Sequence, residues 1–150
     1  MLYLGIDQHR KQLTVEDRNE NGDRTVRRQV STRWGSVRTF LQEYSQRAMP
    51  EGGFVVIVEV CGFNRWLVKL LAAYGCRQVI LIQPEKRSKR KTDRRDASAL
   101  AELLWVNRQR LLAGKGGQGI RRVAWPTDSE AADRQVTVLR QRLGQLRTRT

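Results

Sequence analysis

The feature that most constrains the fold is a strand–helix–strand pattern between residues 54 and 82. Residues 54–58 form a continuous, mostly β-branched run, which is typical of a strand that is buried on both faces. A helical face follows, with apolar residues three and four apart, and Gly75 is placed to end that helix. Residues 79–82 form a second apolar run. Two such runs, joined by a helix within about 30 residues, predict a parallel βαβ unit and therefore an α/β fold.

Three short strands are predicted ahead of this unit. Residues 3–7 are mostly apolar, and residues 12–16 alternate weakly between apolar and polar side chains. An Asn-Gly step at 21–22 indicates a hairpin turn, and residues 25–30 then form the returning strand. Three antiparallel strands followed by the βαβ unit predict a five-stranded mixed sheet flanked by helices.

Helices are also predicted outside the βαβ unit. One follows the third strand, with Ser31 and Thr32 as candidate N-caps. A second runs from about residue 93 to residue 107, and the glycine-rich residues 114–119 then form a flexible connector. The final helix carries apolar residues at heptad spacing over two heptads, at Val136, Leu139, Leu143 and Leu146.

The charge of the chain is strongly positive and uneven. The formal net charge is +14, of which residues 1–75 contribute +3 and residues 76–150 contribute +11. Such a field attracts polyanions, and nucleic acid is the common one. The sequence shows no membrane-spanning stretch and no signal peptide. Two cysteines cannot build a disulfide framework, and a single histidine with no CxxC motif argues against a zinc site.

Two carboxylates stand at the ends of apolar runs. Asp7 ends the first predicted strand, and Glu59 ends the first strand of the βαβ unit. If these strands are parallel neighbours, the two acids lie close together and repel each other unless a cation or a proton lies between them. Mg²⁺ is the plainest cation, because it prefers oxygen ligands. The alternative is that each is an ordinary strand-end acid bonded to backbone amides.

A second acidic pair stands at the start of the predicted helix 93–107. Asp93 and Asp96 are three residues apart, so a helix would place them on one face, in line with its buried apolar stripe. Arg94 and Arg95 would then point outward. The alternative is a helix start, with Asp93 as the N-cap and Asp96 at the third position, where the helix dipole favours both. Two strand acids and two helix acids make the kind of cluster that two-metal phosphoryl transfer needs.

Three sequence blocks resemble the Asp-Glu-Asp-Asp N-terminal domain of the insertion-sequence one-ten transposases. They are Gly-Ile-Asp at 5–7, Val-Glu-Val-Cys-Gly at 58–62 and Lys-Thr-Asp-Arg-Arg-Asp-Ala at 91–97. The leucine- and arginine-rich tail at 139–143 is also similar, so the resemblance covers nearly the whole chain. It implies a ribonuclease-H-like fold, as in Holliday-junction resolvases. It also implies action on DNA in the transposition and recombination of a mobile insertion sequence.

The resemblance further implies which residues and partners carry the activity. It assigns catalysis and the binding of Mg²⁺ or Mn²⁺ to Asp7, Glu59, Asp93 and Asp96. Members of the family use a structured guide RNA and form oligomers through a helical segment after the domain. A bacterial cytoplasmic, nucleoid-associated protein is expected.

The domain layout is expected from the same resemblance. We expect a metal-binding domain at 1–110, a connector at 111–127 and the start of a coiled-coil-like segment at 128–150. The family's C-terminal, serine-bearing domain has no counterpart in these 150 residues. We therefore expect an incomplete enzyme that does not exchange strands by itself, or a non-catalytic nucleic-acid-binding remnant.

Basic residues around the second acidic pair are the candidate nucleic-acid contacts. Residues 86–95 hold seven basic groups and one acid, and a loop is predicted there. They either hold the phosphate backbone, without reading the base sequence, or form a solvated basic loop. The seven are Lys86, Arg87, Lys89, Arg90, Lys91, Arg94 and Arg95.

One histidine and the tryptophans have two interpretations each. His9 lies two residues beyond Asp7 and shares its strand face if the strand persists, although a surface histidine is the commoner case. The tryptophans could stack on bases, but their positions on helix faces favour core packing; they are Trp34, Trp66, Trp105 and Trp125. A small nucleotide-binding protein is a third, weaker hypothesis, because no phosphate-loop motif is present.

Overall fold

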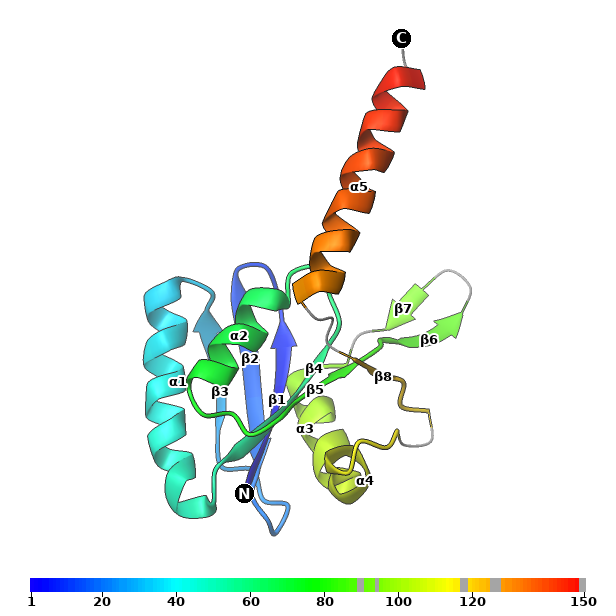
Figure 1. The fold of residues 1–150 in the computed structure, drawn as a ribbon. Coiled ribbons are helices and arrows are strands. Elements are labelled where there is room, and N and C mark those ends of the chain that lie inside the picture. Colours follow the sequence, from blue (N-terminus) through cyan, green and yellow to red (C-terminus); the bar gives the residue numbers. More distant parts are fainter. Residues whose placement is uncertain (89–90, 94, 117–118, 125–127, 149–150) are drawn as a thin grey trace.

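Figure 1 shows the computed structural model, which describes residues 1–88, 91–93, 95–116, 119–124 and 128–148. Within these residues the main sheet has six strands in the order β3-β2-β1-β4-β5-β8, and β6 pairs with β7 in a separate hairpin. The strands are β1 (Leu2–Gln8), β2 (Gln12–Arg18), β3 (Arg27–Ser31), β4 (Phe54–Glu59), β5 (Val79–Ile82), β6 (Glu85–Ser88), β7 (Lys91–Asp93) and β8 (Arg122–Val123). The helices are α1 (Trp34–Ala48), η1 (Met49–Glu51), α2 (Arg65–Ala73), α3 (Ala97–Val106), α4 (Arg108–Leu112) and α5 (Asp128–Thr148).

The strand pairing confirms the predicted α/β pattern. β1 pairs with β2 in antiparallel and with β4 in parallel orientation, and β4 pairs with β5 in parallel orientation. The prediction of five strands was one short for this sheet. The sixth strand, β8, pairs with β5 through only two residues, which is too few for any alternation to appear in the sequence.

Alternate residues of the central strands face two separate cores. Leu4 and Ile6 of β1 pack with the helices α1 and α2, whereas Tyr3 packs with α3. In β4, Val56 and Val58 join the first core, and residues 55 and 57 join the second. Because side chains alternate along a strand, residues 7 and 59 lie on the α3 face of the sheet.

Helix α3 lies directly against β1 at Gly5. A Cβ atom at this position would be 2.5 Å from the backbone nitrogen of Ala101 and 2.5 Å from the backbone oxygen of Ala97. Only a glycine permits this approach, because any side chain would push the helix backbone away. Gly5 therefore sets how closely the start of α3 lies to the end of β1.

The region between β5 and α3 differs from the prediction. Residues 86–95 were expected to form a loop, but β6 and β7 form a hairpin in which Glu85 pairs with Asp93 and Lys86 with Thr92. Pairing uses backbone groups, so it does not need the apolar alternation by which strands are recognised. The helix expected from residue 93 begins at Ala97, because the backbone of Asp96 is extended.

The start of α1 also differs from the prediction. Neither Ser31 nor Thr32 is the N-cap, because the helix begins at Trp34, and Arg33 caps it without a side-chain hydrogen bond. The hydroxyl of Ser31 accepts a hydrogen bond from the Arg33 backbone N–H at 3.3 Å. The Thr32 hydroxyl instead donates to the backbone oxygen of Arg10 at 2.9 Å, which joins two turns at this end of the sheet.

Helix α5 extends away from the sheet (Figure 1). The apolar residues at heptad spacing are exposed along it, at Val136, Leu139, Leu143 and Leu146. Among the described residues, no helix is both long and apolar enough to span a membrane.

Candidate active site at the carboxyl edge of the sheet

Asp7 and Glu59 occupy corresponding places on neighbouring strands. Ile6 of β1 pairs with Val58 of β4 in parallel register, and the two acids are the next residue on each strand. The prediction that these strand ends are neighbours is therefore confirmed. The side chain of Asp7 is 15% exposed and that of Glu59 is 2% exposed, so the second carboxylate is buried and the first is reachable from solvent.

The buried carboxylate of Glu59 is held by Arg95. Its Oε1 accepts hydrogen bonds from the Arg95 guanidinium at 3.0 Å and from the Arg95 backbone N–H at 3.2 Å. The guanidinium also donates to the backbone oxygen of Gln83 at 3.4 Å. The prediction that Arg95 points outward was wrong, because a buried carboxylate draws a cation inward. Arg94 lies outside the described residues.

His9 contacts the other strand acid. Its Nε2 lies 2.9 Å from Oδ2 of Asp7, while the imidazole remains about half exposed. The His9 backbone N–H donates to the backbone oxygen of Gln12 at 2.9 Å, so the turn between β1 and β2 fixes the position of the ring. The contact comes from the turn and not from a continued strand, because β1 ends at Gln8, and the half-exposed imidazole also fits the interpretation of His9 as a surface histidine.

Asp96 caps α3. Its Oδ1 accepts a hydrogen bond from the Ala99 backbone N–H at 2.7 Å. Asp96 therefore belongs to the helix start, as the alternative interpretation expected. It is the N-cap itself, whereas that interpretation placed it at the third position. Asp93 lies in β7 and not in a helix, so the argument that both acids share a helix face was wrong. The side chain of Asp93 lies outside what the structure describes.

The acids that the structure describes offer the donor atoms that a hard cation requires. In the described part of the chain, no group of three or more His, Cys, Asp or Glu side chains is placed to hold a metal ion. Mg²⁺, however, is commonly bound through one or two carboxylates, with waters and substrate phosphates completing its shell. Asp7 and Glu59, on adjacent strands and on one face, fit that donor set.

A buried amide network, which the sequence did not reveal, fixes the segment that follows Glu59. Gln8 is fully buried on the opposite face from Asp7, and its Oε1 accepts a hydrogen bond from Nδ2 of Asn64. Its Nε2 donates to the backbone oxygen of Phe63 at 2.9 Å. The Oδ1 of Asn64 accepts a hydrogen bond from the Cys61 backbone N–H at 2.6 Å. The only signal in the sequence was a glutamine at the end of an apolar strand.

Glu16 is a further buried acid on the same face, and its role is structural. It lies opposite Gly5 in the pairing of β1 with β2. Its carboxylate accepts hydrogen bonds from the Arg18 guanidinium at 2.6 Å and from the Ser98 hydroxyl at 2.9 Å. These contacts fasten α3 to β2 and so support the position of Asp96.

The basic residues predicted to contact nucleic acid lie on and around the β6–β7 hairpin. The hairpin projects beyond the main sheet (Figure 1). The backbones of Lys86, Arg87 and Lys91 belong to it, but their side chains lie outside what the structure describes. Lys89 and Arg90 lie wholly outside the described residues. Of the seven, only Arg95 has a described side-chain contact, which is the pair with Glu59.

Comparison with known proteins identifies the family. The model of the DEDD transposase domain of the IS110 family matches residues 4–150. A search of curated proteins gave no match. The family match spans the sheet, the carboxyl-edge acids, the hairpin and α5. The chain therefore belongs to the IS110 family of DEDD transposases.

Proposed function

We propose that this transposase domain acts on DNA through a magnesium-dependent, ribonuclease-H-like catalytic site. The observation that carries the proposal is the placement of Asp7 and Glu59 side by side, at the ends of two parallel strands and on one face. The strand order β3-β2-β1-β4-β5, with two antiparallel and then two parallel pairings, supports the ribonuclease-H-like assignment.

Four acids are assigned to the metal. Asp7 and Glu59 would bind it from the sheet, and Asp93 and Asp96 from the segment that leads into α3. When bound, Mg²⁺ or Mn²⁺ would polarise a phosphodiester oxygen and lower the pKa of a coordinated water. His9, in contact with Asp7, would orient that carboxylate.

The basic residues are assigned to DNA. The cations at 86, 87, 89, 90, 91 and 94 would hold the phosphate backbone near the acids. Arg95 stabilises Glu59 in the described structure, and a guanidinium at this place can also bind a phosphate in bidentate fashion. The exposed apolar stripe of α5 would pair with another copy of the chain, and a structured guide RNA is a further expected partner.

Metal binding tests this proposal. Titration calorimetry with Mn²⁺ should show binding to the chain that Asp7→Asn weakens at least about tenfold, because one ligand oxygen loses its charge. Asp23→Asn is the matched control, since Asp23 is an exposed acid in the turn between β2 and β3. Equal Mn²⁺ affinity of the Asp7→Asn variant and the unchanged chain would contradict the proposal.

A non-catalytic nucleic-acid-binding role is the second candidate. The observation that favours it is the ion pair between Arg95 and Glu59, which already supplies a cation to the buried acid. This role predicts DNA binding that EDTA and the Asp7→Asn substitution leave unchanged, with no cleavage of branched DNA when Mn²⁺ is added.

A further inference from the structure

The loops at the carboxyl edge of the sheet carry exposed cations around an exposed tryptophan. We name this surface the carboxyl-edge patch. Two of its residues lie in the turn after β1, two at the junction of β3 and α1, and two in the first turns of α2, and all six are exposed. They are Arg10, Lys11, Arg33, Trp34, Arg65 and Lys69.

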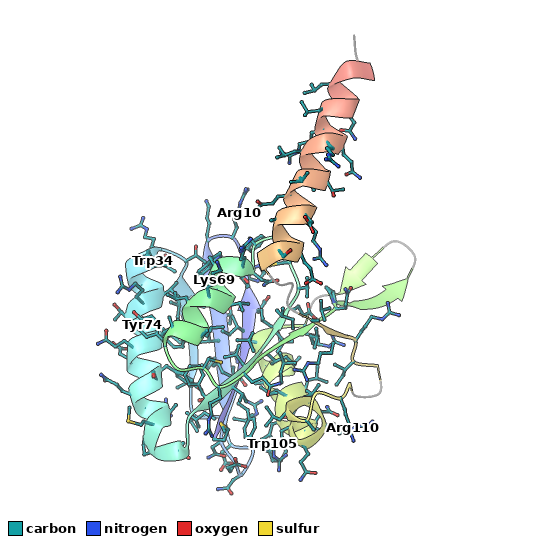
Figure 2. All side chains as sticks on the ribbon, viewed as in Figure 1. Arg10, Trp34, Lys69, Tyr74, Trp105 and Arg110 are labelled. Atoms are coloured by element: carbon teal, nitrogen blue, oxygen red, sulfur yellow. The ribbon has the colours of Figure 1, made fainter. Side chains whose placement is uncertain are left out.

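The two turns on the β1 side of the patch are joined to each other. The Thr32 hydroxyl donates to the backbone oxygen of Arg10 at 2.9 Å, and the Thr32 backbone N–H donates to the oxygen of Lys11 at 3.0 Å. Arg10 and Lys11 directly follow His9 in the turn after β1 and therefore lie close to Asp7 in sequence. Figure 2 shows Arg10, Trp34 and Lys69 at the same end of the molecule, with Arg110 at the other.

Trp34 contradicts the expectation that the tryptophans pack in the core. Its side chain is 57% exposed, whereas Phe40 and Tyr44 of the same helix are buried and stacked on each other. Trp66 and Trp105 do pack against the two cores. Tryptophan is enriched among the residues that contribute most to binding at interfaces.

Acids are missing from the segments that form the patch. Residues 8–15, 31–42 and 60–69 contain no Asp or Glu. Elsewhere in the described part of the chain, some cations pair with acids; Arg28, for example, lies 3.2 Å from Glu43. The side of the patch formed by Arg10, Lys11 and Arg33 therefore carries three cations and, within its own segments, no acid, which suits a polyanion whose phosphates lie near the two strand acids.

We propose that the carboxyl-edge patch binds an unpaired stretch of the DNA substrate, with one base stacked on Trp34 and phosphates held by Arg10, Lys11 and Arg33. This inference rests on the proposed function and adds the form of DNA that the site receives. A flat indole stacks only on a base whose face is uncovered, and duplex stacking covers the faces of internal bases. Unpaired DNA is therefore the occupant that uses both the cations and the tryptophan.

Fluorescence anisotropy with labelled oligonucleotides tests the stacking contact. The chain is titrated, in EDTA, into a single-stranded DNA of about 20 nucleotides and into the duplex of the same sequence. Trp34→Ala should weaken single-strand binding by roughly 5- to 150-fold, and Trp34→Phe should retain most of the affinity. The effect on the duplex should be smaller. Thermal unfolding of each variant checks that the fold is kept, since Trp34 contributes little to the core.

The salt dependence tests the cations. Each phosphate contact to a single strand contributes about 0.7 to the slope of log K against log salt. Arg10→Ala with Lys11→Ala should therefore reduce that slope by about 1.4. Arg110→Ala, at the opposite end of the molecule, is the matched control and should leave the slope unchanged.

Four outcomes decide the inference. Equal single-strand affinity of Trp34→Ala and the unchanged chain would overturn it, and so would a Trp34 dependence seen with RNA but not with DNA. Trp34-dependent DNA binding in a chain that binds no Mn²⁺ would support the patch while refuting the catalytic site. Mn²⁺ binding that depends on Asp7, together with DNA binding that does not depend on Trp34, would support the catalytic site and refute the patch.

Discussion

Glu59 is the residue on which the candidate site depends most. Its carboxylate is 2% exposed and lies at the end of a strand in which every residue is buried. A charge in such a place requires a partner, and Arg95 supplies both a guanidinium and a backbone N–H. The structural stability of this end of the sheet therefore depends on the same atoms as its proposed chemistry.

Removing one member of this pair should destabilise the protein more than removing both. We expect Arg95→Met to lower the free energy of unfolding by about 3 kcal/mol, because it leaves a buried carboxylate without its guanidinium. Adding Glu59→Gln to Arg95→Met should recover much of that loss. Urea denaturation of the three variants measures the effect, and additive losses in the double variant would count against the pairing.

Residue-level geometry marks the limit of what the sequence could predict. The neighbouring positions of Asp7 and Glu59 followed from two apolar runs and a parallel pairing, and both were correct. The inward turn of Arg95 could not be predicted, because it depends on a carboxylate 36 residues away in sequence. The exposure of Trp34 was missed for a related reason: its residue type favours burial, and only the packing of α1 shows which of its faces is covered.

Among the elements, α3 has the most influence on the site, and its first turn depends on Asp96. The side chain of Asp96 caps the helix and is also an assigned metal ligand. Asp96→Ala should lower the free energy of unfolding by about 1 kcal/mol, whereas Asp96→Asn should be nearly neutral, since asparagine caps as well as aspartate does.

The same two variants separate the cap from the metal site. Thermal or urea unfolding measures the first role, and Mn²⁺ calorimetry measures the second. Under the proposed function both variants should lose Mn²⁺ affinity, although only one loses stability. Full Mn²⁺ affinity in Asp96→Asn would remove Asp96 from the ligand set while leaving its cap intact.

The contact between α3 and β1 makes a second prediction at this scale. Gly5→Ala should lower the free energy of unfolding by about 3 kcal/mol, because its Cβ would meet helix backbone, which cannot turn aside as a flexible side chain can. Gly35→Ala in α1 is the matched control. No atom lies within 4 Å of its Cβ position, and we expect stabilisation of about 0.5 kcal/mol. Equal effects of the two changes in urea denaturation would contradict the close packing at Gly5.

Elements with strong apolar patterns were predicted well, and those built from charged residues were not. β4 and β5 follow directly from their runs of Val, Ile and Leu. The described strands of the β6–β7 hairpin contain mostly charged residues, and this composition predicts a loop and not a strand pair. The sequence predicts that α3 begins at about residue 93, four residues before its first residue, Ala97. Acidic residues are favoured both just before a helix and in its first turn, so they do not locate its first residue.

At the scale of the whole molecule, the buried Tyr44 and the half-buried Cys76 make stability sensitive to alkaline pH. Burial, with Asp17 next to its hydroxyl, raises the pKa of Tyr44 well above its ordinary value. Burial raises the pKa of the Cys76 thiol to about 12. Both groups stay protonated in the folded chain at a pH where the unfolded chain releases the proton, so stability is lost as pH rises.

The loss should begin near pH 9, the ordinary pKa of the thiol, and steepen above pH 10, where tyrosine also ionises in the unfolded chain. Each group contributes a slope of about 1.4 kcal/mol per pH unit. Urea denaturation at several pH values measures it. Tyr44→Phe should be less stable at pH 7 but should show a shallower decline above pH 10, and an unchanged decline would contradict this assignment.

The outer strand β3 has a consequence for how the protein behaves in concentrated solution. It is an edge of the main sheet, and its residues Arg27 and Arg28 are more than half exposed. An open strand edge is a template on which another molecule's strand can add, and charged side chains discourage that addition. Replacing these arginines with neutral β-branched residues, as a way to reduce non-specific DNA binding, would therefore invite aggregation through strand addition.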